Sequence, residues 1–99
     1  MPISNDKKKQ FRTVGHGLKP IVTIAGKGLS AGVSAEIERA LSDHELIKIK
    51  LAVDDRETRK EIIAEICAHA KAESIQEVGK VLLIFRKSTK EVLKTSNIR

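Results

Sequence analysis

The sequence is poor in aromatic residues: it contains two phenylalanines, Phe11 and Phe85, and neither tryptophan nor tyrosine. The core must therefore be built from aliphatic side chains. The same shortage argues against a sheet that stacks nucleobases on exposed aromatic rings, as RRM domains do. A single cysteine excludes an internal disulfide and fits a reducing compartment, for which we expect the cytoplasm.

Long hydrophobic runs are also missing. No apolar run approaches the roughly 20 residues of a membrane-spanning helix, and the polar segment 1–9 lacks the apolar centre of a secretory signal. We find no repeats, no low-complexity segment and no interior linker, so the 99 residues predict a single domain, 1–99. We expect its core to span about residues 4–87, followed by a polar tail, 88–99, with a tendency to fray.

Charge is distributed unevenly along the chain, which carries 19 Lys and Arg against 13 Asp and Glu. The net charge is +5 for residues 1–30, −4 for residues 31–79 and +5 for residues 80–99, which together give +6. If the fold brings the two basic ends together, they form a patch that attracts polyanions. Charge alone leaves two interpretations open, which are nucleic-acid binding and a contribution to solubility.

The order of apolar and polar residues predicts helices that alternate with strands. Helices are expected over 4–14, 31–43 and 54 to about 72, and strands over 21–25, 46–53, 75–78 and 81–85. Ser4 and Asp54 are the expected N-caps, with Glu57 completing a capping box, and Gly15 and Gly17 are expected to end the first helix. The order α-β-α-β-α-β-β predicts an α/β fold, a four-stranded mixed sheet with helices packed on it.

The segment 46–53 alternates between apolar and other side chains. One side of the expected strand carries Ile47, Ile49, Leu51 and Val53, and the other carries Lys48, Lys50 and Ala52. We therefore expect a half-buried strand whose second side presents two lysines on a sheet face that is only partly covered.

The residues that most often carry chemistry form no catalytic or metal-binding pattern. His16, His44 and His69 lack metal-ligand spacing, and Cys67 has no partner cysteine. Helix capping explains Asp54 without a catalytic role. We expect no catalytic residue, no metal, no cofactor and no small-molecule substrate.

A glycine-containing loop, Gly26-Lys27-Gly28, lies between a predicted strand and a predicted helix. Free N–H groups near a helix N-terminus and the Lys27 ammonium suit a phosphate oxygen. The Gly-Lys-Ser/Thr ending of a P-loop is absent. On spacing alone, an ordinary strand-to-helix turn with glycine at positive φ is the simpler explanation.

Several segments resemble the bacterial YhbY proteins, which are stand-alone CRM (CRS1–YhbY) RNA-binding domains. These segments read LKP (18–20), AGKGL (25–29), HELIKIK (44–50) and DRET (55–58), and the match extends over about residues 4–87. The resemblance implies a fold similar to the C-terminal domain of bacterial translation initiation factor three. It also implies association with precursors of the large ribosomal subunit, while related plant domains serve group II intron splicing.

The resemblance further implies that the loop contacts RNA. The family has a Gly-x-x-Gly loop, likened to the loop with which KH domains clamp the RNA backbone. In this chain Gly28 keeps the second glycine, whereas Ala25 stands at the first position. We expect Ala25 to keep a negative φ and Gly26 to take over the bend.

We therefore predict a non-catalytic, cytoplasmic RNA-binding protein, with a monomer favoured and with ribosomal RNA or a large-subunit precursor as its partner. The candidate RNA-binding residues are Ala25, Gly26, Lys27, Gly28, Leu29, Lys7, Lys8, Arg12, Lys19, Lys48, Lys50, Arg86 and Lys87. The alternative is a protein-interaction adaptor that docks on a ribosomal protein or assembly factor through the acidic middle of the chain, Glu36 to Glu77.

Overall fold

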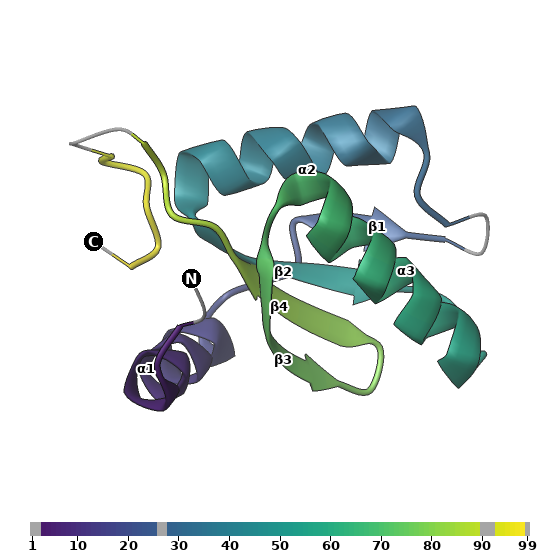
Figure 1. Ribbon diagram of the computed structural model, residues 1–99, viewed down its shortest axis with the longest axis horizontal. Helices are drawn as coiled ribbons and strands as arrows, with labels where there is room; N and C mark the ends of the chain where they lie inside the picture. The colour runs from purple at the N-terminus through teal and green to yellow at the C-terminus, as the bar shows by residue number, and fades with distance from the viewer. Residues whose placement is uncertain (1–2, 26–27, 90–92, 99) are drawn as a thin grey trace.

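The computed structural model describes residues 3–25, 28–89 and 93–98. The elements are α1 (Asn5–His16), β1 (Val22–Ile24), α2 (Ala31–His44), β2 (Leu46–Leu51), α3 (Arg56–Ala70), β3 (Glu73–Val78) and β4 (Val81–Phe85). Within the described residues, the strands form one four-stranded sheet in the order β1-β2-β4-β3 (Figure 1). Strand β1 pairs with β2 in parallel, and the other neighbours pair antiparallel, which confirms the predicted α/β fold with a mixed sheet.

Helices α2 and α3 cover one face of the sheet (Figure 1). The aliphatic side chains that meet there include Ile24, Ile49, Leu51, Leu82 and Ile84 from the strands and Ile37, Leu41, Ile62 and Ile66 from the helices. All of them are buried, as expected for a core without aromatic residues. None of the helices in the described part of the chain combines the length and hydropathy needed to cross a membrane.

Helix α1 covers part of the opposite face. Phe11 of α1 packs with Leu46, Ile75 and Leu83 of the strands in a second, smaller cluster. The ring centroids of Phe11 and Phe85 lie 4.6 Å apart. Both aromatic residues of the chain are therefore used to attach α1 to the sheet.

The predictions for the two ends of α1 are confirmed except at Gly15. The side chain of Ser4 accepts a hydrogen bond from the backbone N–H of Lys7 at 3.2 Å, so Ser4 is the N-cap as predicted. Gly17 is the C-cap, also as predicted, but Gly15 does not end the helix, which continues to His16. A β-carbon at Gly15 would lie 2.6 Å from Cδ2 of Leu83, so this glycine allows α1 to approach the sheet closely.

Helix α3 begins one residue later than predicted. Asp55, not Asp54, is the N-cap, and its Oδ2 accepts a hydrogen bond from the backbone N–H of Thr58 at 3.0 Å. Asp54 instead forms an ion pair with Lys80 in the β3–β4 turn. The bond from Lys80 lowers the pKa of Asp54, and the bonds from Thr58 lower the pKa of Asp55. The predicted capping box is wrong because the chain uses Asp54 to connect α3 with the hairpin.

The C-terminal segment (residues 93–98) packs at the junction of α2 and β2. The backbone N–H of Asn97 donates to the carbonyl of His44 at 3.0 Å, and its Nδ2 donates to the carbonyl of Leu46 at 2.7 Å. The side chain of Leu93 is buried. The expectation of a fraying tail is therefore wrong for this segment, whose polar side chains bond to the backbone at the end of α2.

Candidate nucleic-acid interface

The part of the sheet that α1 leaves uncovered carries lysines. Lys48 and Lys50 of β2 point to this side, because Ile49 between them points into the core below α2 and α3. Lys50 pairs with Thr23 of β1 and Val81 of β4, and paired residues share one face of a sheet. Lys48 is half-buried and Lys50 is exposed. The expected half-buried strand with two lysines on its second side is confirmed.

Lys19 lies beside these lysines, because Lys19 and Lys48 line the same small cleft at the start of β1. The backbone N–H of Ile21 donates to the carbonyl of Lys48 at 3.0 Å and holds this segment alongside β2. Among the described residues, Lys19, Lys48 and Lys50 take part in no ion pair. We call these three residues the lysine strip. Its ammonium groups remain available to an anion.

The strip is also free of acidic neighbours in the adjoining strands. The strand residues that share its face and pair with Lys48 and Lys50 are Thr23 of β1 and Val81 and Leu83 of β4. Each of these side chains is uncharged. A polyanion that approaches this face therefore meets positive charge without a nearby carboxylate of the strands.

The loop of residues 25–29 is described only at its ends, because Gly26 and Lys27 lie outside the described residues. Gly28 has a φ of 77°, a conformation that favours glycine, and its N–H donates to the carbonyl of Ala25 at 3.0 Å. The described non-glycine residues with positive φ do not include Ala25, as expected. Leu29 is half-buried and packs against the core.

The cations of α1 lie away from the loop. Figure 1 shows α1 below one end of the sheet, near the C-terminal segment, whereas the end of β1 and the start of α2 lie toward the other end of the molecule. Lys7 lines a cleft together with Lys87, and Lys8 and Arg12 are half-buried on α1. The structure thus separates these four cations from the loop rather than gathering all candidates around it.

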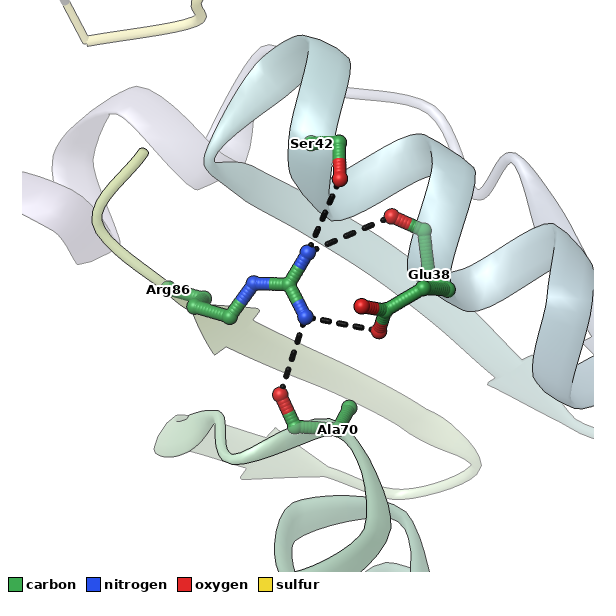
Figure 2. Close-up of polar contacts among 4 residues, drawn as sticks. All are labelled: Glu38, Ser42, Ala70 and Arg86. Atoms are coloured by element: carbon green, nitrogen blue, oxygen red, sulfur yellow. Dashed lines mark hydrogen bonds and ion pairs between the residues drawn. The ribbon is translucent and has the colours of Figure 1, made fainter. Parts of the chain in front are cut away.

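Arg86 points to the side of the sheet that α2 and α3 cover, and its guanidinium bonds within the protein (Figure 2). Its Nη1 donates to Oε2 of Glu38 at 2.6 Å and to the carbonyl of Ala70 at 3.1 Å. Its Nη2 donates to Oγ of Ser42 at 3.0 Å and to the carbonyl of Glu38 at 3.3 Å. With 21% of its side chain exposed, this candidate RNA contact links α2, the end of α3 and the end of β4.

Glu45 has a structural role that the sequence analysis missed. It is 1% exposed and has a φ of 64°. Its carboxylate accepts hydrogen bonds from the backbone N–H of Ser88 at 2.6 Å and from Oγ of Ser96 at 2.8 Å. Glu45 therefore holds the chain after β4 and the C-terminal segment at the start of β2. A charged residue between a helix and a strand gives no signal of such burial.

Among the described residues, no cluster of three or more His, Cys, Asp and Glu is placed to hold a metal ion. The thiol of Cys67 is half-buried, and burial, followed by the charge of Glu73, raises its pKa. A raised pKa disfavours the thiolate, which is the nucleophilic form.

Taken together, the helix-covered face and the lysine-bearing face define a small basic α/β domain with one cationic face. The sequence matches the model of the CRS1/YhbY (CRM) domain over residues 3–86, and the chain belongs to this family. The resemblance seen in the sequence is thereby confirmed. The C-terminal segment lies outside the matched residues.

Relatives extend the match to nearly the whole chain. A protein of Pseudomonas aeruginosa named probable RNA-binding protein is 46% identical over 98 residues, which cover 99% of this chain and 94% of the relative. An RNA-binding protein of Haemophilus influenzae is 46% identical over 89% of this chain and 90% of its own length. The solution structure of a hypothetical protein from Staphylococcus aureus shares the fold, with a TM-score of 0.80, 23% identity and coverage of 92% and 95% of the two chains.

Proposed function

We propose that this protein binds RNA, without catalysing a reaction, through contacts between its lysine strip and the sugar–phosphate backbone. The strip is the observation that carries the proposal. Lys48 and Lys50 stand on one sheet face, Lys19 lines a cleft together with Lys48, and none of the three has an ion-pair partner among the described residues. Two relatives with 46% identity are named for RNA binding. Neutralising phosphates with such groups releases counterions, which supplies most of the affinity of basic proteins for nucleic acids.

The loop extends the strip. Thr23 pairs with Lys50, and the next pair, Ile24 with Leu51, brings the chain to the start of the loop. The backbone of the RNA would therefore run from Lys19 along β2 to the loop, where Gly26, Lys27 and Gly28 receive a phosphate.

The RNA partner is ribosomal RNA or its precursor, bound during assembly of the large subunit by a monomer in the cytoplasm. The ribosomal part of this proposal follows from the family resemblance of the sequence, and the cytoplasmic part from the single cysteine. With two phenylalanines as its only aromatic residues, the protein would recognise RNA by backbone and shape rather than by aromatic stacking.

A salt titration of binding to a hairpin of large-subunit ribosomal RNA tests the proposal. Substitution Lys27→Ala should weaken binding and reduce the slope of log K against log salt by about 0.7–0.9, the contribution of one phosphate contact. Lys60→Ala, which removes an exposed charge from α3, is the matched control and should leave the slope unchanged. An unchanged slope for Lys27→Ala would remove this residue from the site.

The identity of the partner is tested in cells by crosslinking followed by sequencing of the bound RNA. Reads concentrated in large-subunit ribosomal RNA support the proposal, and reads spread over unrelated transcripts contradict the ribosomal part of it.

Pull-down from nuclease-treated lysate distinguishes RNA binding from the alternative function of a protein-interaction adaptor. A protein adaptor keeps its partners after this treatment, whereas an RNA-binding protein loses most of them.

A further inference from the structure

A small cleft lies where the start of β1, the end of α2 and the C-terminal segment meet. Its volume is about 130 Å³, and its lining residues are Leu18, Lys19, Ile21, His44, Ile47, Lys48 and Asn97. Two lysines of the strip line this cleft. Asn97 belongs to the C-terminal segment, outside the residues that match the CRM domain. The cleft is therefore lined both by residues of the CRM domain and by a residue that follows it in the chain.

The polar wall of the cleft consists of His44 and Asn97, which have fixed orientations. Nδ1 of His44 lies 2.8 Å from the carbonyl oxygen of Thr95, and because a carbonyl only accepts, Nδ1 carries a proton. Nδ2 of Asn97 donates to the carbonyl of Leu46. Nε2 of His44 and the Oδ1 of Asn97 have no hydrogen-bond partner within the described chain. The wall therefore offers Nε2 of the His44 ring, together with the Oδ1 acceptor and the second N–H of the Asn97 amide.

The apolar part of the cleft is unusually accessible. Ile21 is 49% exposed and, with Val78, is one of the exposed large hydrophobic residues of the described chain. Leu18, which also lines the cleft, is half-buried. An exposed aliphatic side chain beside two lysines gives the cleft an apolar floor and a cationic rim.

A ligand that fits all three features is a flat, hydrogen-bonding ring attached to an anion. An inorganic anion would leave Ile21 and the amide of Asn97 unused, and an apolar peptide would leave the lysines unpaired. A nucleotide matches the polar wall, the apolar surface and the lysines of the cleft. Its base has polar edges and an apolar face, and its phosphate is negative. A cleft of this volume takes one base at most.

We propose that the cleft binds the base of one unpaired nucleotide of the RNA, with its phosphate between Lys19 and Lys48. The inference rests on the proposed RNA binding and deepens it, since it makes an unpaired nucleotide next to a paired region the preferred substrate. In this arrangement the C-terminal segment has a direct role, because it supplies Asn97 and orients His44 through Thr95.

Binding to two RNA hairpins tests the inference. The hairpins are identical except that one carries a single bulged uridine, and fluorescence anisotropy at fixed salt gives the ratio of their affinities. The wild-type protein should prefer the bulged hairpin by about tenfold, which corresponds to about 1.4 kcal/mol. Asn97→Ala and Ile21→Ala should each reduce this ratio to nearly one.

A control variant accompanies these substitutions. Val78→Ala removes an exposed aliphatic side chain that lies outside the cleft, and it should keep the full preference. Because Ile21 does not hold the C-terminal segment, an unchanged ratio in Ile21→Ala would overturn the inference regardless of the Asn97 result.

The failures of the two proposals are distinguishable. Equal, salt-sensitive binding of both hairpins by the wild-type protein would refute the nucleotide cleft and leave the proposed RNA binding standing. Absence of binding to either hairpin at low salt would refute both.

Discussion

The two faces of the sheet differ in what covers them, although both are built from the same strand, β2. On the side of α2 and α3, Ile47, Ile49 and Leu51 are almost completely buried. On the side of α1, Lys48 is half-buried and Lys50 is exposed. On that same side, however, Leu46 is fully buried in the cluster with Phe11. The comparison teaches that β2 contributes core residues to both faces, and that its positive charge lies on the second face, beyond the part that α1 covers. Lys48 and Lys50, unlike Leu46, can therefore change without loss of the fold.

The largest expected effect is on stability and concerns the helix-covered face. Ile49→Ala should lower the free energy of unfolding by about 2–5 kcal/mol, because it leaves a cavity in the packed core. Lys50→Ala, the next residue, should change it by less than about 0.5 kcal/mol. Urea denaturation measures both variants. Equal losses would show that the two faces do not divide stability and charge in this way.

Arg86 provides the second comparison, because it is a basic residue that serves the helix-covered side. Arg86→Met should destabilise the protein by about 1–3 kcal/mol, since it removes the part-buried hydrogen bonds of the guanidinium to the Ala70 carbonyl and to Oγ of Ser42, together with the ion pair to Glu38. Its neighbour Lys87 is exposed, and Lys87→Met is the control, with little expected change. If Arg86→Met left the stability unchanged but bound RNA much more weakly, the structural role of Arg86 would be contradicted and its predicted role in RNA binding supported.

A smaller effect is expected where α1 meets the lysine-bearing face. Gly15→Ala places a β-carbon against Leu83 and should cost about 1–2 kcal/mol, because the helix must move away from the sheet. Gly32→Ala in α2 meets open space and should stabilise by about 0.5–1 kcal/mol. Thermal unfolding distinguishes the two. If both substitutions stabilised the protein, α1 could accommodate the added β-carbon without a loss in the free energy of unfolding.

Local patterns were sufficient to predict the fold class. The alternation in β2, the Ser4 cap and the hairpin around Gly79 each depend on residues near one another in the sequence, and the structure confirms them. Periodicity also predicted which side of β2 carries the lysines. The strand order β1-β2-β4-β3 was not predicted, because it depends on how distant segments pair.

The site was less predictable because it depends on where distant segments meet. The charge totals along the chain could not predict that the Arg86 side chain points to α2. They also could not predict that α1 lies away from the loop. Nothing near Asn97 in the sequence indicated that it lines a cleft with Lys48. Such contacts arise from tertiary packing, which residue spacing does not encode.

The most direct test of the lysine strip compares two double variants that remove the same charge. Lys48→Ala/Lys50→Ala removes two cations from the open sheet face, and Arg39→Ala/Lys60→Ala removes two exposed cations from α2 and α3. Salt titrations of binding to one ribosomal RNA hairpin measure the number of phosphate contacts in each. The account predicts that the first pair lowers the slope by about 1.4–1.8, while the second pair leaves it unchanged. Equal slopes for the two variants would contradict it.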